Sequence, residues 1–343
     1  LVGSEMCIRD SFINNYADTY GGAIYQNGGT LYVNGSIFSG NHSTAAGGAI
    51  RKSNGDLIID SSKFLNNWVE YNDTTTHNGD GGALALYGSG NVTIKNSLFE
   101  GNEARTSSAS NNGGAIIVDS YESVVKISST IFRNNKAGNS SGGAIYNQSN
   151  LTVDSSIFEG NTSGTTGGAI HYTAYNKPSD SDPLTELITG SKFINNTAGT
   201  NGGAIALNIG NDLTISGSNF TGNSAAYYGG AIRIENAAIN ISDTNFTGNS
   251  AEYYGGAISS NSNSVGWSVS NSVFDGNYSA QYGGAITIMD STANVNIEKS
   301  VFRNNYISAN TGYNSCGGAI MQSYGESFSG TLGKVIILSL IHI

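Results

Sequence analysis

The stretch that decides the fold is GGAIYNQSNLTVDSSIFEGN, residues 142–161, because closely similar stretches recur along the chain. GGA followed by Ile or Leu begins at Gly21, Gly47, Gly81, Gly113, Gly142, Gly167, Gly202, Gly229, Gly255, Gly283 and Gly317. A second word, F-x-x-N, alternates with it and begins at Phe12, Phe38, Phe64, Phe99, Phe132, Phe158, Phe193, Phe220, Phe246, Phe274 and Phe302. The period of about 25 to 35 residues is typical of a solenoid. One elongated body is therefore predicted, although the length of 343 residues alone suggests two domains.

Each repeat reads as short strands. Apolar residues stand seven and five positions before the Phe, as Leu151 and Val153 do before Phe158, and this period of two indicates a strand with one buried face. Glu186 is the one break in that pattern. Ser or Thr stands two positions before the Phe in every complete repeat: Ser36, Ser62, Ser97, Thr130, Ser156, Ser191, Ser218, Thr244, Ser272 and Ser300. A small hydroxyl at a constant separation from the Phe indicates that every coil places these two side chains in the same environment.

The Asn of F-x-x-N fits a turn, and stacked copies are expected to form a ladder with the phenylalanines. The residues concerned are Asn41, Asn67, Asn102, Asn135, Asn161, Asn196, Asn223, Asn249, Asn277 and Asn305. With about three strands per repeat and no amphipathic helical stretch, each coil itself forms the crossover that parallel strands need. The sequence predicts a single right-handed parallel β-helix of about eleven coils. At about 4.8 Å per coil, the rod is on the order of 50 Å long.

The two ends of the chain do not read as protein. Residues 1–11 (LVGSEMCIRDS) and 338–343 (LSLIHI) back-translate into opposite strands of one DNA sequence over a shared stretch, and they resemble the transposon-end adapter used in tagmentation sequencing libraries. We therefore expect both to be artefacts. Residues 12–337 are expected to be the repeat domain, a fragment open at both ends. The tail LGKVIILSLIHI is too short for a membrane helix, so no membrane insertion by this segment is expected.

Composition narrows the classes of partner. The chain has 47 Gly, 2 Pro, 12% charged residues and a net charge of −10. This sparse acidic surface argues against nucleic acid or anionic lipid as a partner, because both demand clustered Lys and Arg. Outside the terminal segments Cys316 is the only cysteine, so neither a disulfide framework nor a cysteine metal site is expected. No cofactor is predicted.

The alternation of GGAI and F-x-x-N over residues 12–337 resembles the repeat of the chlamydial polymorphic outer membrane proteins and of adhesin-like β-helix proteins of gut and environmental microbes. The resemblance implies a cell-surface or secreted adhesin segment. In the chlamydial case it implies an autotransporter passenger at the outer membrane. The expected partner is a glycan or a surface protein of another cell, and no catalysis is expected.

Departures from the repeat are the candidate binding sites. Longer loops lie at residues 68–80, 103–112, 306–316 and 171–185, and they contain the candidates Trp68, Tyr71, His171, Tyr172 and Tyr175. Neutral insertions would give the same pattern. Tyrosines also stand immediately before a GG, and those of three consecutive coils should stack; they either bind a ligand or merely cover the glycines. These residues are Tyr20, Tyr228, Tyr254 and Tyr282.

The alternatives to an adhesin are an inert stalk and a polysaccharide lyase or hydrolase. Such an enzyme needs carboxylates on adjacent coils. The carboxylates of the GGAI strands, Asp119, Glu235 and Asp290, are expected to lie too far apart to cooperate. Two loop clusters remain as weak catalytic candidates, although solvated loop residues are the favoured explanation for them: His171 with Asp180, Asp182 and Glu186, and His77 with Asp73 and Asp80.

Overall fold

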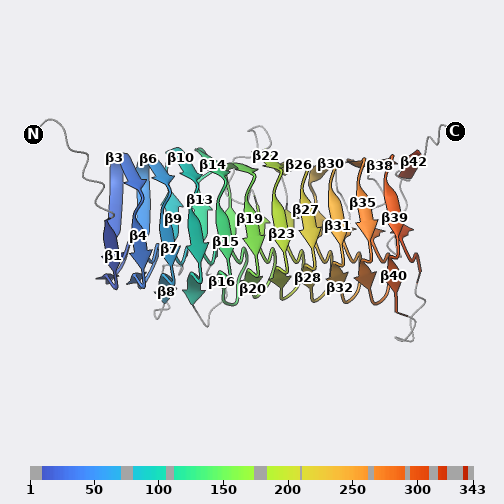
Figure 1. Ribbon diagram of the computed structural model, residues 1–343, viewed down its shortest axis with the longest axis horizontal. Helices are drawn as coiled ribbons and strands as arrows, with labels where there is room; N and C mark the ends of the chain where they lie inside the picture. Colours follow the sequence, from blue (N-terminus) through green and yellow to red (C-terminus); the bar gives the residue numbers. More distant parts are fainter. Residues whose placement is uncertain are drawn as a thin grey trace, which may run out of the picture.

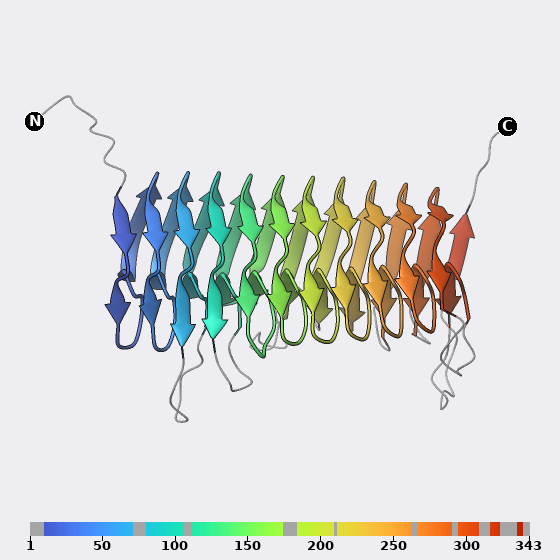
Figure 2. The same cartoon turned by 60° about the horizontal axis from the view of Figure 1, so that its bottom comes forward.

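The chain winds into a rod of stacked coils (Figure 1). The computed structural model describes residues 10–70, 80–105, 112–173, 184–208, 211–261, 266–289, 294–308, 316–322 and 335–338. Within these ranges all regular structure is β-strand, and all sheets are parallel. Corresponding strands of successive coils pair along the rod, which Figure 2 shows from a second direction. The predicted all-β parallel β-helix of about eleven coils is confirmed.

The first sheet has eleven strands and carries the Phe of F-x-x-N at the centre of each strand. Its strands are β1 (Ser11–Ile13), β4 (Ile37–Ser39), β7 (Lys63–Leu65), β11 (Leu98–Glu100), β15 (Ile131–Arg133), β19 (Ile157–Glu159), β23 (Lys192–Ile194), β27 (Asn219–Thr221), β31 (Asn245–Thr247), β35 (Val273–Asp275) and β39 (Val301–Arg303).

The second sheet, also of eleven strands, follows the Asn of F-x-x-N. Its strands are β2 (Tyr16–Ala17), β5 (His42–Ser43), β8 (Trp68–Glu70), β12 (Glu103–Arg105), β16 (Lys136–Ala137), β20 (Thr162–Ser163), β24 (Thr197–Ala198), β28 (Ser224–Ala225), β32 (Ser250–Ala251), β36 (Tyr278–Ser279) and β40 (Tyr306–Ile307).

The third sheet has twenty strands and joins the GGAI segments to the apolar segments that follow them. In the first coils each pair of segments is one long strand, β3 (Ile24–Asn34) or β6 (Ile50–Asp60). Later coils divide it into two: β9 (Leu84–Tyr87), β10 (Gly90–Lys95), β13 (Ile116–Asp119), β14 (Ser123–Ser128), β17 (Ile145–Asn147), β18 (Asn150–Asp154), β21 (Ile170–Tyr172), β22 (Leu184–Thr189), β25 (Ile205–Asn208), β26 (Asn211–Ser216), β29 (Ile232–Glu235), β30 (Ala238–Ser242), β33 (Ile258–Ser260), β34 (Trp267–Ser270), β37 (Ile286–Ile288), β38 (Val295–Glu298), β41 (Ile320–Gln322) and β42 (Val335–Leu338). These coils therefore have four strands instead of the expected three, because a connection of two or more residues interrupts the long strand.

A phenylalanine stack runs along the interior from Phe12 to Phe302. Neighbouring rings lie 4.6–5.0 Å apart between centroids, with interplanar angles of 2–11°. The rings from Phe38 to Phe274 are fully buried. Each Phe ring packs against the equivalent ring of the next coil, so every coil needs its neighbours to bury its own Phe side chain.

Beside this stack runs an asparagine ladder. The Asn161 side-chain amide donates to the Phe132 carbonyl at 3.0 Å and to Asn196 Oδ1 at 2.9 Å. Asn161 Oδ1 accepts from the backbone and side-chain N–H groups of Asn135, at 3.0 and 2.9 Å. The hydroxyls before each Phe form a second ladder, in which Ser156 Oγ donates to the Asp154 carbonyl and accepts from the Thr130 backbone N–H. These ladders satisfy buried polar groups at the turns of the coil.

The paired glycines mark a corner where two backbone segments nearly touch. Gly142 has a left-handed backbone with φ of 71°. Gly143 does not need that region, but a Cβ built on it lies 2.0 Å from the Gly168 carbonyl oxygen and 2.7 Å from backbone atoms of Thr162. The first glycine is thus required by conformation and the second by space.

Gly143→Ala is expected to destabilise the coil by about 3 kcal/mol, because the corner has to separate to admit one methyl group. Gly248→Ala is the matched control, since Gly248 has a φ of +61° but a Cβ added there meets no atom within 4 Å. It is expected to cost about 1 kcal/mol, from backbone strain alone. Chemical denaturation followed by circular dichroism measures both, and equal losses would contradict the close-approach argument.

Candidate functional site

Five tyrosines lie beside the paired glycines of three consecutive coils, and we call Tyr227, Tyr228, Tyr253, Tyr254 and Tyr282 the tyrosine row. The Tyr228 and Tyr254 rings stack at 4.9 Å and 4°, and Tyr254 and Tyr282 follow at 5.2 Å and 40°. Tyr227 and Tyr253, which precede Tyr228 and Tyr254 in the sequence, lie beside each other with their ring centroids 5.5 Å apart. Tyr227 is 45% exposed and the others are at least half-buried. Because neighbours cover both faces of Tyr254, its accessible part is the ring edge.

A buried cation lies at one end of the tyrosine row. The Arg233 guanidinium is 4.8 Å from the centroid of the Tyr228 ring, and the Arg233 side chain is only 4% exposed. Its Nε donates to Glu235 at 3.1 Å and its Nη1 donates to Ser259 at 2.8 Å. Burial lowers the pKa of Arg233, and the nearby Glu235 carboxylate opposes that change. Glu235, a catalytic candidate in the sequence, is therefore held as the partner of a buried arginine.

Tyr20 belongs to a different group, because Ala46 and Asp80 occupy its column on the next two coils. The Arg51 guanidinium lies between two rings, 3.6 Å from the centroid of Tyr20 and 4.4 Å from that of Tyr87. Tyr87 donates its hydroxyl to Asp80 at 3.1 Å. We call Tyr20, Arg51, Asp80 and Tyr87 the arginine–tyrosine cluster.

Asp80 is a strongly perturbed carboxyl, although the sequence placed it only in a weak loop cluster. It is 3% exposed and accepts a hydrogen bond from the Asn112 backbone N–H at 2.9 Å. Burial raises the pKa of the Asp80 carboxyl to about 7, with a smaller contribution in the same direction from the charge of Asp119, against the hydrogen bonds from Asn112 and Tyr87 and the charge of Arg51. Asp119 therefore lies near enough to Asp80, on the preceding coil, to affect its charge, whereas in the sequence Asp119 was compared only with the distant Glu235 and Asp290.

Three predicted candidates are buried. His171 is 6% exposed, its Nδ1 lies 2.8 Å from the Thr166 hydroxyl, and burial lowers its pKa to about 4. Tyr172 is fully buried in the hydrophobic core, so its prediction as a ligand-binding residue is wrong. It follows His171 on a strand and therefore points to the opposite face.

Glu186 is fully buried as well, so its place in a solvent-exposed catalytic cluster is wrong. Its carboxyl accepts from the Leu151 backbone N–H at 3.1 Å and from the Asn147 side chain at 3.3 Å. Burial raises the pKa of Glu186 well above its usual range. The carboxyl is thus a structural group of the interior.

Trp68 lies in an aromatic stack on the second sheet. Its ring stacks on His42 at 4.2 Å and 7°, and His42 lies 4.7 Å from Tyr16. The Arg105 guanidinium lies 4.5 Å from the centroid of the Trp68 ring on the next coil. Trp68 is therefore partly accessible but already enclosed by neighbours. The candidates Tyr71 and Tyr175 lie outside the described residues, as do Asp73, His77, Asp180, Asp182 and Asp290.

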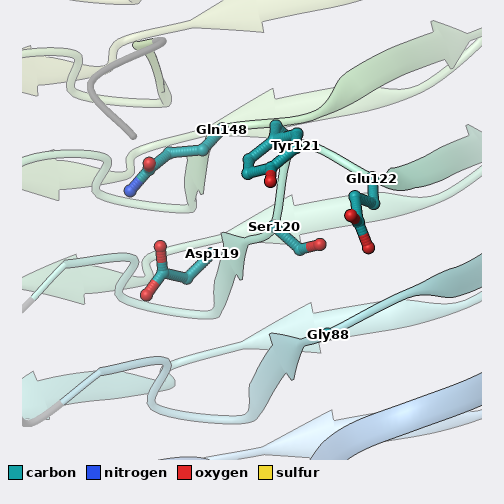
Figure 3. A pocket seen from close by; sticks show the side chains of 6 residues that line it. All are labelled: Gly88, Asp119, Ser120, Tyr121, Glu122 and Gln148. Carbon is teal, nitrogen blue, oxygen red and sulfur yellow. The ribbon is translucent and has the colours of Figure 1, made fainter. Parts of the chain in front are cut away.

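A pocket of about 370 Å³ opens at the fourth coil (Figure 3). Asp119, Ser120, Tyr121 and Glu122 line it from one coil, and Gln148 and Gly88 line it from the two neighbouring coils. Sequence reasoning considered Asp119 alone, because nothing in the repeat marks the turn that follows it.

Comparison with known protein families agrees with this geometry. The Chlamydia polymorphic membrane protein repeat matches six segments, residues 11–33, 35–51, 129–148, 155–173, 217–235 and 243–261. The chain carries polymorphic membrane protein repeats. That repeat points to a surface-exposed, adhesin-like outer membrane protein family, which is not an enzyme family. Nothing among curated proteins or solved structures matches the chain.

The matched segments contain most of the tyrosine row, including Tyr228 and Tyr254, whereas Asp119 and its turn lie between matches. Among the described residues no helix is long and apolar enough to cross a membrane.

Proposed function

We propose that this chain is the passenger segment of a cell-surface adhesin, displayed at the outer membrane in the manner of an autotransporter, and that it binds a glycan of another cell without catalysis. The observation that carries the proposal is the tyrosine row. Rings that are partly exposed and repeat with the coil present the same contact three times in register. An inert stalk has no need of such a surface.

The chemistry of the row favours a glycan over other polymers. Tyrosine combines an apolar ring with a hydroxyl that both donates and accepts, and this suits the mixed surface of a sugar. The ring spacing of 4.9–5.2 Å is close to the length of one sugar residue in an extended glycan. The net charge of −10 disfavours strongly anionic polymers.

The absence of catalysis is part of the proposal. Glu235, which lies at the end of the tyrosine row, is engaged by Arg233. The proposal is supported further by the non-enzymatic character of the repeat family.

A glycan array probed with the full chain tests this function. Binding to a defined set of neutral glycans is expected, and the combined variant Tyr227→Ser, Tyr253→Ser, Tyr254→Phe is expected to weaken it at least tenfold, which is about 1.4 kcal/mol. These changes remove exposed ring surface and one hydroxyl while leaving the core intact. Tyr32→Ser is the matched control, because Tyr32 is 71% exposed and lies on another part of the rod.

Two outcomes would contradict the proposal. No binding to glycans, mucin or host cells would favour the stalk. Release of reducing ends or unsaturated sugars from a bound polysaccharide would favour the enzyme.

A further inference from the structure

The pocket at the fourth coil arises from a local change in the coil. The connection from β13 to β14 has three residues, Ser120, Tyr121 and Glu122, whereas the corresponding connections of the coils on either side have two. The Ser123 N–H is directed back to the Ser120 carbonyl at 3.4 Å, which forms a turn. The longer corner leaves a hollow of about 370 Å³ between three coils. This volume lies at the lower end of the range for small-molecule sites.

Gln148 supplies the observation that points to a ligand. The residue is 7% exposed and its backbone N–H donates to the Val118 carbonyl at 2.9 Å. The residue lines the pocket, and its side-chain amide forms no hydrogen bond with any described residue. The polar atoms of this amide therefore open onto the pocket, where a bound molecule can form hydrogen bonds with them.

The other lining groups define the chemistry of that molecule. The carboxylates of Asp119 and Glu122 accept hydrogen bonds, the amide of Gln148 donates and accepts, and the Ser120 hydroxyl does both. Tyr121, which is 39% exposed, adds a ring. Figure 3 shows these side chains spread around the hollow, with Asp119 and Glu122 on opposite sides of the turn. Acceptors, an amide and an aromatic ring together suit a ring of hydroxyl groups with an apolar face.

We propose that this pocket binds a single sugar residue that carries no acidic group. The two carboxylates repel uronic and sialic acids, since like charges in one small site disfavour each other. The site lies four coils from the tyrosine row, about 20 Å at about 4.8 Å per coil. It shares the ligand class of the proposed function, but its occupancy does not depend on that row.

Titration of the isotopically labelled full chain with methyl β-glucopyranoside, methyl β-galactopyranoside and methyl β-glucuronopyranoside, followed by NMR, tests the inference. Saturable shifts confined to residues near 119–122 and 148 are expected with at least one neutral glycoside and not with the glucuronoside. Gln148→Leu keeps the volume and removes the unpartnered amide, so it is expected to weaken binding at least tenfold without lowering the unfolding midpoint. Glu122→Gln is expected to admit the glucuronoside.

Tyr254→Phe separates this inference from the function proposed above, because it lies in the tyrosine row and should leave these shifts unchanged. Loss of array binding with intact shifts would support the tyrosine row as the adhesive surface and the pocket as a separate site. Unchanged array binding in the combined tyrosine variant, with intact shifts, would count against the row and leave the pocket as a binding site. Three results would overturn the inference: no saturable shifts with either neutral glycoside, undiminished binding in Gln148→Leu, or equal binding of methylammonium, which would indicate a simple cation pocket.

Discussion

Between pH 4 and pH 8 the wild-type chain is expected to lose about 4 kcal/mol of unfolding free energy relative to the Asp80→Asn variant. Burial raises the pKa of Asp80 from an ordinary 3.8 to about 7. That is roughly three pKa units at about 1.4 kcal/mol each. In this window the folded chain holds a proton that the unfolded chain has released, so rising pH favours unfolding. The stabilisation is complete below about pH 4 and is lost once the pH has passed about 7.

Asparagine is a suitable replacement because it keeps an acceptor for the Asn112 N–H and a polar group facing the Tyr87 hydroxyl. Chemical denaturation at several pH values measures both curves. Taking the difference matters, because His171 acts in the opposite direction: its folded pKa of about 4 makes stability fall as the pH drops below its ordinary 6.5. This contribution is common to both proteins and cancels.

Glu186→Gln is an independent comparison, since burial also raises the pKa of that interior carboxyl. The Glu186→Gln variant is therefore expected to lose less unfolding free energy than the wild type as the pH rises. Parallel pH curves for wild type and Asp80→Asn would show that Asp80 is ionised in the folded chain. The hydrogen bonds from Tyr87 and Asn112 and the charge of Arg51 would then outweigh the effect of burial.

The repeat words predicted what is periodic in this molecule. A Phe, its Asn and a pair of glycines at fixed separations define one coil, because each of them contacts its own copy in the next coil. Phe158 and Asn161 could therefore be placed in their ladders without coordinates. The tyrosine stack followed from the same logic, since equivalent positions must lie one coil apart.

What the sequence could not predict depends on contacts between non-equivalent positions. Lys52 is fully buried, and its Nζ donates hydrogen bonds to the backbone carbonyls of Tyr87 and Ser89 on the next coil, each at 3.0 Å. Asp80 is buried where its carboxyl accepts from the Tyr87 hydroxyl and from the Asn112 backbone N–H on the next coil. The pocket beside Gln148 exists because one corner is a residue longer than its neighbours. Each of these features comes from a departure from the period.

Asn161→Ala is expected to remove about 4 kcal/mol from the stability of the coils around it. The two Asn135 N–H groups lose their acceptor and the Phe132 carbonyl loses a donor, all within the interior. An unsatisfied buried polar group costs about 1–3 kcal/mol, so three together exceed the loss of one ordinary hydrogen bond several times over.

Native-state hydrogen exchange of the β15, β19 and β23 amides measures this effect, because a solenoid need not unfold in one step. Protection should fall most in these strands and less towards both ends of the rod, since each coil contacts only its neighbours. Thr162→Ala is the matched control: Thr162 follows Asn161 directly, faces outward and is exposed, so a change within about 0.5 kcal/mol is expected. Similar protection in Asn161→Ala and Thr162→Ala would mean that the phenylalanine stack, and not the asparagine ladder, holds the coils in register.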